Sequence, residues 1–174
     1  MKPQRDIHDY ALRYERARKR VQTAKISERN RHLIVDFEKV CALERLSLPR
    51  RIKLMSYLVI LARDYLKKDF DKATKDDLKD VVLRIDGRDD LSVWTRHSYK
   101  SILKQFYRWL TFGDSYRSRV EEPDIVAWLR ANVTQKEKPK VRAADILTEK
   151  EIQKLIEVAE HPRDKAFISM LYEL

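Results

Sequence analysis

Apolar residues recur along this chain at intervals of three and four positions, which is the period of an amphipathic α-helix. The clearest case runs from Ser92 to Leu110, where one face carries Tyr99, Ile102, Leu103, Phe106 and Leu110. The opposite face carries no carboxylate and consists of His97, Lys100, Ser101, Lys104 and Arg108. We expect a core to hold the apolar side while the basic side faces an anion. The alternative is a solvated surface helix that is basic by chance.

The same period predicts helices on both sides of this segment. They are expected over Asp6–Ala24, Ser27–Leu46, Leu46–Leu66 and Thr74–Ile85, in a short helix from Pro123, and after Thr148 and Pro162. The chain has only two glycines, which is few for the turns of a β-rich protein. The predicted fold class is therefore all-α, without a sheet.

Changes in composition divide the predicted helices into four parts. Residues 1–25 are expected to form a basic N-terminal helix or arm, which packs on another subunit, follows a phosphate backbone or simply lies on the surface. Residues 26–133 are expected to form one helical domain. Residues 134–146 form a basic linker, and residues 147–174 begin a second domain whose two helices are too few to bury their apolar faces. Because the pattern stops in mid-helix at Leu174, we expect a fragment.

The balance of charge indicates the class of partner. Lys and Arg number 38 against 28 Asp and Glu, which gives a net charge of +10. Such a charge favours a polyanion, with nucleic acid first and an anionic membrane surface second. No apolar run is long enough to span a membrane and no signal peptide is present, so we expect an intracellular, cytoplasmic protein. The abundance of Lys, Arg and Glu over Asn and Gln suggests a thermophilic source.

No group of residues predicts catalysis or a cofactor. The single cysteine, Cys41, lies at an apolar position, and the four histidines are scattered, so we expect neither a metal site nor a cofactor. Three cations, Arg50, Arg51 and Lys53, follow Ser47 and Pro49 at the start of a predicted helix. Positive charge at that end opposes the helix dipole, which favours an external anion there. Simple tolerance of an exposed basic cluster is the alternative.

Several stretches in the same order and spacing resemble one known family. They are Ile26–Asn30, the Leu46–Leu66 helix, Trp94-Thr95 leading into Phe106–Leu110, Leu147–Glu151 and, most clearly, Pro162–Glu173. The chain resembles the N-terminal part of tyrosine recombinases, the phage-integrase family, and most closely the integrases of archaeal viruses and plasmids. In that family a run such as Pro162–Glu173 leads into a turn that carries the first catalytic arginine.

The resemblance implies a fold and an activity. Residues 26–133 would be a SAM-like core-binding bundle, one half of a clamp around a duplex DNA half-site. Helices matching Leu48–Lys67 and Val93–Leu110 would face the major groove. The whole protein would integrate or recombine DNA and self-associate on it as a dimer or tetramer. The family's catalytic residues have no match within this chain, so we expect it to be inactive, with Tyr172 a core or interface residue.

These considerations give a set of candidate DNA-binding residues. We expect phosphate contacts from the three cations at the start of the Leu46–Leu66 helix and from Lys100 and Lys104. Base-edge contacts are expected from Arg96, His97 and Ser98. Trp94 and Thr95 are expected near a thymine methyl or a sugar, although Trp94 suits a core position equally well. The linker cations are expected to cross the backbone. The full set is Ser47, Arg50, Arg51, Lys53, Trp94, Thr95, Arg96, His97, Ser98, Lys100, Lys104, Lys136, Lys138, Lys140 and Arg142. A helical DNA-binding regulator with no enzymatic parent and a protein-interaction module are the alternative functions.

Overall fold

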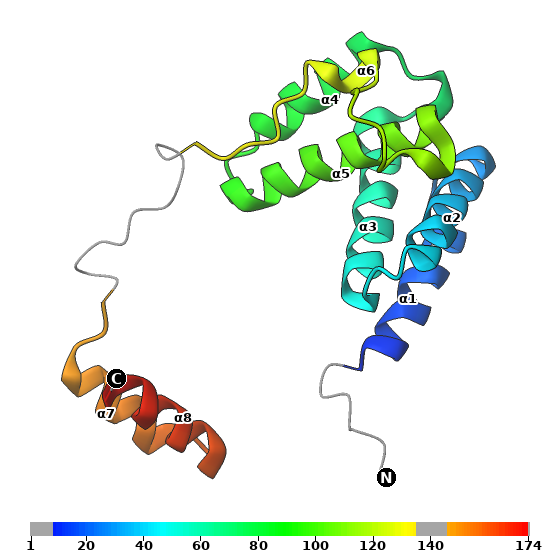
Figure 1. Ribbon diagram of the computed structural model, residues 1–174. Coiled ribbons are helices and arrows are strands. Elements are labelled where there is room, and N and C mark those ends of the chain that lie inside the picture. The colour runs from blue at the N-terminus through cyan, green and yellow to red at the C-terminus, as the bar shows by residue number, and fades with distance from the viewer. Residues whose placement is uncertain (1–8, 135–145, 174) are drawn as a thin grey trace. The chain divides into compact units, whose positions relative to one another are not determined.

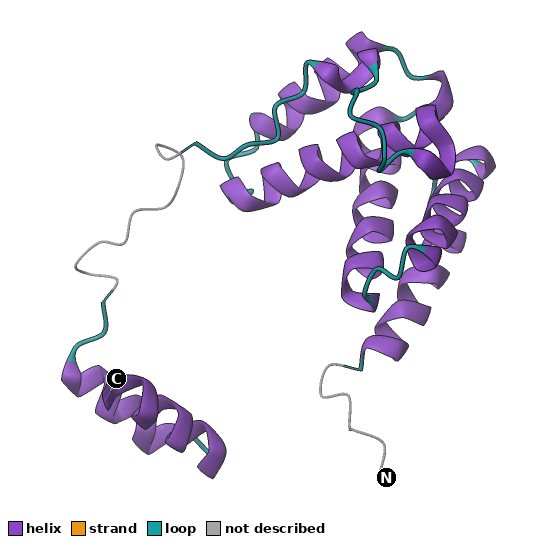
Figure 2. Cartoon of the chain, viewed as in Figure 1, coloured by secondary structure: helices purple, strands orange, loops and turns teal. Residues whose placement is uncertain are grey.

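A computed structural model describes residues 9–134 and 146–173, which belong to two separate units, residues 1–135 and 136–174. Every regular element among the described residues is helical (Figures 1 and 2), so the predicted all-α class is confirmed. No helix in these two ranges is both long and apolar enough to cross a membrane.

The first unit contains six α-helices and three short helical turns within its described residues. They are α1 (Tyr10–Thr23), α2 (Glu28–Leu43), α3 (Leu48–Ile60), the π-helix η1 (Leu61–Leu66), the 3-10 turn η2 (Phe70–Lys72), α4 (Lys75–Asp86), α5 (Val93–Phe112), the 3-10 turn η3 (Gly113–Ser115) and α6 (Asp124–Ala127). In this unit α3 packs on α1, α2 and α5, while α4 packs on η1, α5 and α6. Helix α5 therefore connects the two groups, because it contacts both α3 and α4.

The predicted helix starts agree with the observed caps. Ser27 accepts a hydrogen bond from Asn30 N, and Ser92 accepts one from Thr95 N. Thr74 forms a complete capping box with Asp77. Each cap satisfies backbone donors that a helix N-terminus leaves unpaired. The local sequence alone is therefore enough to set where α2, α4 and α5 begin.

Helix α1 is part of the first unit rather than a separate arm. Its side chains Ala17 and Val21 are buried, and the helix packs on α3 and α2. The domain boundary expected at residue 25 is therefore absent, because α1 belongs to the same unit as the helices that follow it. The alternating apolar spacing of this segment gives a narrow buried stripe, which is enough to attach a helix to a bundle.

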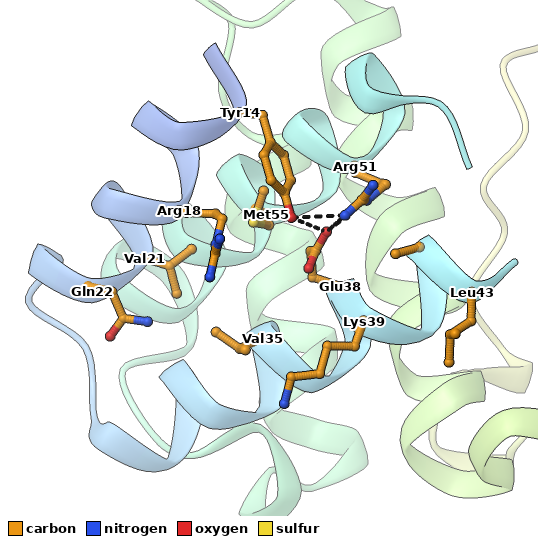
Figure 3. Close-up of a pocket in the computed structure, with 11 residues that line it drawn as sticks. Tyr14, Arg18, Val21, Gln22, Val35, Glu38, Lys39, Leu43, Arg51 and Met55 are labelled. Carbon is orange, nitrogen blue, oxygen red and sulfur yellow. Dashed lines mark hydrogen bonds and ion pairs between the residues drawn. The ribbon is translucent and has the colours of Figure 1, made fainter. Parts of the chain in front are cut away.

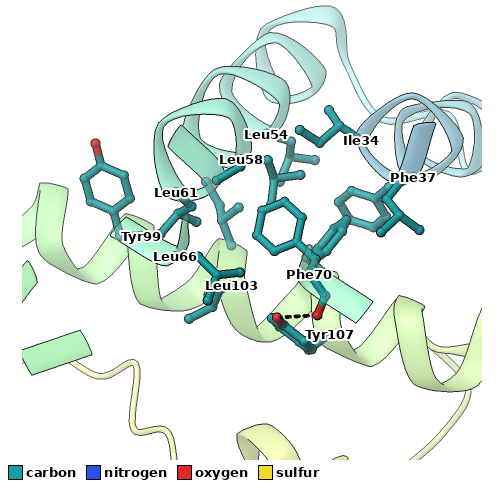
Figure 4. Close-up of a cluster of buried hydrophobic side chains, with 14 of the residues drawn as sticks. Ile34, Phe37, Leu54, Leu58, Leu61, Leu66, Phe70, Tyr99, Leu103 and Tyr107 are labelled. Atoms are coloured by element: carbon teal, nitrogen blue, oxygen red, sulfur yellow. Dashed lines mark hydrogen bonds between the residues drawn. The ribbon is translucent and has the colours of Figure 1, made fainter. Parts of the chain in front are cut away.

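Aromatic side chains pack among aliphatic ones in the buried core of the first unit (Figure 4). The Phe106 ring of α5 lies 5.3 Å from the ring of Phe37 on α2, 4.8 Å from that of Phe70 and 5.5 Å from that of Trp109. Both Phe37 and Phe106 are completely or almost completely buried. These contacts connect α2, α5 and the η2 turn, as the apolar face of the Ser92–Leu110 segment predicted.

One buried amide fixes the chain between η1 and η2. Asn30 on α2 donates to the carbonyl of Lys68 at 2.9 Å and accepts from the backbone N–H of Phe70 at 2.8 Å. The hydroxyl of Tyr107 donates to the carbonyl of Phe70 at 2.9 Å (Figure 4). Because these polar groups are bonded to one another, their burial carries no desolvation penalty for an unpaired group.

The second unit consists of α7 (Glu149–Val158) and α8 (Pro162–Glu173), which pack on each other. Thr148 and Glu151 form a capping box at the start of α7, where the sequence predicted a helix. Large apolar side chains on this pair remain exposed, namely Leu155, Val158, Phe167, Met170 and Leu171. Tyr172 is 44% exposed and is therefore not a core residue of this unit.

Candidate nucleic-acid interface

Two exposed cations on α3 have neutral partners on α5. Arg50 donates to the side-chain oxygen of Gln105 at 3.3 Å, and Lys53 donates to the hydroxyl of Ser98 at 2.9 Å. Neither cation forms an ion pair with a carboxylate among the described residues. We call these four residues, Arg50, Lys53, Ser98 and Gln105, the α3–α5 basic face. Its two positive charges are available to an external anion.

The helix dipoles add to this positive potential. Neither α3 nor α5 has an acidic residue in its first turn. Ser47 occupies the N-cap position of α3, but its side chain makes no capping hydrogen bond. The partial positive charge of each helix N-terminus is therefore not offset by a carboxylate on that turn. Arg50 lies in the first turn of α3, where this charge is greatest.

The other predicted base-reading residues lie at the start of α5. Trp94 is 50% exposed and packs edge-on against His97, with 6.2 Å between the ring centroids. This places Trp94 on the surface of the unit, so it is not a core residue. Thr95 shares a hydroxyl hydrogen bond of 2.9 Å with Ser92, while Arg96 donates to the backbone carbonyl of Asp86 at 2.9 Å.

Three cations on the basic side of α5, which was expected to face an external anion, have acidic partners on other elements. Lys100 forms an ion pair with Asp86 at 2.9 Å. Lys104 and Arg108 both pair with Glu122, at 3.3 and 2.8 Å. Their side chains are only 16%, 26% and 18% exposed. These carboxylates belong to the end of α4 and the segment after η3, so helical spacing within α5 gives no sign of them.

Arg51 also has an internal partner, although it lies between Arg50 and Lys53 in the sequence of α3. It donates through Nε to Glu38 Oε1 at 2.7 Å and through Nη2 to the hydroxyl of Tyr14 at 2.8 Å (Figure 3). Tyr14 in turn donates to Glu38 at 2.8 Å. Burial, together with the hydrogen bond to Glu38, raises the pKa of Tyr14. Arg51 therefore neutralises a carboxylate that is 10% exposed.

The Tyr14–Glu38–Arg51 cluster forms one wall of a groove of about 610 Å³ between α1 and α2. The rest of the groove is lined by apolar side chains, including Val35 and Met55, and by the polar side chains of Arg18, Gln22 and Lys39 (Figure 3). Because Arg51 is paired with Glu38, its positive charge is already neutralised inside the protein. The cluster explains Arg51 as a structural residue that joins α1, α2 and α3.

The sequence interpretation missed Gln105 and included residues that the structure does not describe. Ser98 and Gln105 are seven positions apart and therefore share one side of α5, a spacing from which Gln105 could have been found. The four linker cations, Lys136, Lys138, Lys140 and Arg142, lie outside the described residues. The structure thus brings together Arg50, Lys53 and Ser98 of the predicted set.

Comparisons with known proteins yield no relative from which a function could be transferred. No protein-family model, no curated protein and no solved structure matches this chain. The function is therefore inferred from the residues of the chain and from the arrangement of α3 and α5.

Proposed function

We propose that residues 9–134 bind duplex DNA as the core-binding part of a tyrosine recombinase. The observation that carries this proposal is the α3–α5 basic face, where Arg50 and Lys53 are exposed and have only neutral acceptors. The sequence resemblance supports the same class, and it supports assigning the bundle to the SAM-like type. The net charge of +10 favours a polyanionic partner.

In this proposal the N-terminal halves of α3 and α5 approach one major groove. Arg50 and Lys53 neutralise phosphates and release counterions, which gives binding a strong dependence on salt. Arg96, His97 and Ser98 lie at the start of α5, from which side chains reach base edges. The exposed Trp94 ring contacts a thymine methyl or a sugar, together with Thr95.

The rest of the chain has a role in the same proposal. Helices α7 and α8 correspond to the part of the family's catalytic domain that precedes its first catalytic arginine. The linker cations cross the DNA backbone between the two domains. The whole recombinase transfers DNA strands and self-associates on its site, and this stretch of sequence supplies binding rather than chemistry.

The test is the salt dependence of binding to a labelled duplex of about 30 base pairs, measured by fluorescence anisotropy between about 50 and 300 mM salt. The plot of log K against log salt has a negative slope. The double variant R50A/K53A should reduce the magnitude of this slope by about 2, because each phosphate contact contributes about 0.9. The matched control K75A/K79A removes two charges from α4, outside the proposed interface, and should leave the slope near that of the parent.

Three outcomes decide the proposal. A reduced slope for R50A/K53A alone supports it. Equal slopes for R50A/K53A and the parent would show that the α3–α5 basic face does not contact phosphate. A parent protein that binds no duplex at low salt would exclude DNA binding and favour a protein-interaction module.

A further inference from the structure

Three arginines of α1, Arg13, Arg16 and Arg20, lie on the side of the helix that faces α3. All three are exposed, and together with Ala17, Ile52 and Ser56 they line a groove of about 260 Å³. Their spacing of three and four positions places them above one another on one side of α1. We call this groove the α1–α3 arginine groove.

No ion pair joins the three arginines of this groove to a carboxylate in residues 9–134. The Arg13 guanidinium lies 5.7 Å from the centroid of the neighbouring Tyr10 ring. By contrast, Arg18 on another side of α1 pairs with Glu15 at 3.9 Å. A guanidinium presents a planar set of donors that matches two phosphate oxygens. Three of them without an acidic partner form a surface suited to a phosphate chain.

The arginine groove is continuous with the α3–α5 basic face. Ser56, which lines the groove, lies one turn after Lys53 on α3, and Lys53 lies one turn after Arg50. The arginines of α1 and the two cations of α3 are therefore linked through neighbouring turns of α3. Along α1, the seven positions from Arg13 to Arg20 span about 10 Å. One strand of a duplex advances by about three nucleotides over that length.

We propose that the α1–α3 arginine groove binds the phosphate backbone of the same duplex that α3 and α5 enter, on the flank of that major groove. This inference rests on the proposed function. Arg16 and Arg20 each contact one phosphate, and Arg13 contacts the next phosphate along the strand. Helix α1 thus lengthens the DNA footprint of the unit without reading base sequence.

The test compares two double variants in the full chain. R16A/R20A removes two charges from the groove, whereas R18A/K39A removes two exposed charges that line the separate groove between α1 and α2. Against the labelled duplex, R16A/R20A should reduce the magnitude of the salt slope by about 2, and R18A/K39A should reduce it by less than about 0.5. The variant R16K/R20K should recover most of the slope, because lysine neutralises phosphate as a point charge. Since these side chains are exposed, all variants should retain the helicity and melting temperature of the parent.

The outcomes separate this inference from the proposed function. If the parent binds DNA and R50A/K53A weakens binding, but R16A/R20A behaves like the parent, then only the arginine groove is excluded. If the parent binds no duplex, both are excluded. If R16A/R20A loses binding to phosphatidylserine vesicles but keeps its DNA slope, the groove belongs to a membrane surface instead. Equal losses for R16A/R20A and R18A/K39A would mean that only the net charge matters, and the groove would then not be a site.

Discussion

Lys100 donates to both carboxylate oxygens of Asp86, at 2.9 and 3.2 Å, and so ties α5 to the end of α4. The same residue, Asp86, accepts a hydrogen bond from Arg96 through its backbone carbonyl. Two cations that the α5 sequence offers to an external anion are therefore engaged by one residue of the preceding helix. Lys100 therefore differs from Arg50 and Lys53 on α3, whose hydrogen-bond partners are neutral side chains.

The first prediction concerns Lys100. The double variant D86A/K100A removes both charges of the pair, so it should leave the salt slope of DNA binding within about 0.3 of the parent. The single variant K53A should lower that slope by about 0.9. The lost pair should cost about 1 kcal/mol of unfolding free energy, because Asp86 is 45% exposed and its charge is screened by solvent. A slope loss as large as that of K53A would place Lys100 on the DNA.

The second prediction concerns the Tyr14–Glu38–Arg51 cluster. The variant R51M leaves the Glu38 carboxylate without its counter-charge and should lower the free energy of unfolding by about 3 kcal/mol. The double variant E38Q/R51M should lose less than the sum of the two single losses, because it removes both charges. Urea unfolding at neutral pH measures all three values. Strictly additive losses would mean that Glu38 and Arg51 do not interact.

The third prediction concerns the aromatic core. Phe106 is completely buried and contacts the rings of Phe37 and Phe70, so F106A should lower the free energy of unfolding by about 3–5 kcal/mol. Leu83 provides the control because its side chain is 70% exposed. L83A should change the same quantity by less than about 0.5 kcal/mol. A small effect of F106A would contradict the packing of α5 against α2 and η2.

The fourth prediction concerns stability in acid. The hydrogen bond from Lys68, followed by those from Thr74, lowers the pKa of Asp77 from 3.8 to about 2. Because the pKa of Asp77 is lower in the folded state, its carboxylate stabilises that state at any pH above the unfolded-state pKa. This contribution is lost as the pH falls through the folded-state pKa. D77N should therefore lower the melting temperature at neutral pH and flatten its fall between about pH 4 and 2. D80N, on an exposed part of the same helix, should keep the slope of the parent.

Local sequence was enough to predict much of the fold. The caps at Ser27, Thr74, Ser92 and Thr148 depend on contacts three positions away, which are visible in the sequence. The stripe that includes Tyr99 and Phe106 is buried as its spacing predicted. Cys41 is buried as expected, and that burial raises the pKa of its thiol to about 12, so the thiol stays protonated at neutral pH.

The state of each cation was not predictable from local sequence. Arg50, Arg51 and Lys53 form one basic cluster in the sequence, yet only Arg51 turns toward Glu38. Its partner lies 13 positions away on α2. Which cations remain free depends on how separate helices pack, so the candidate interface was located by sequence only as a region of two helices.

The π-helix η1 makes the length of the chain beside it critical. The N–H of Lys67 bonds to the carbonyl of Ala62, five positions back, and four of the six residues in η1 are buried. Just beyond it, Asn30 holds Lys68 and Phe70 from the other side. A surface loop can lose a residue with little effect. A deletion in the segment between Ala62 and Phe70 should be harmful, because hydrogen bonds hold the backbone at both of its ends. A change of length between residues 61 and 70 would therefore break the bonds of Asn30 or displace the buried side chains of η1.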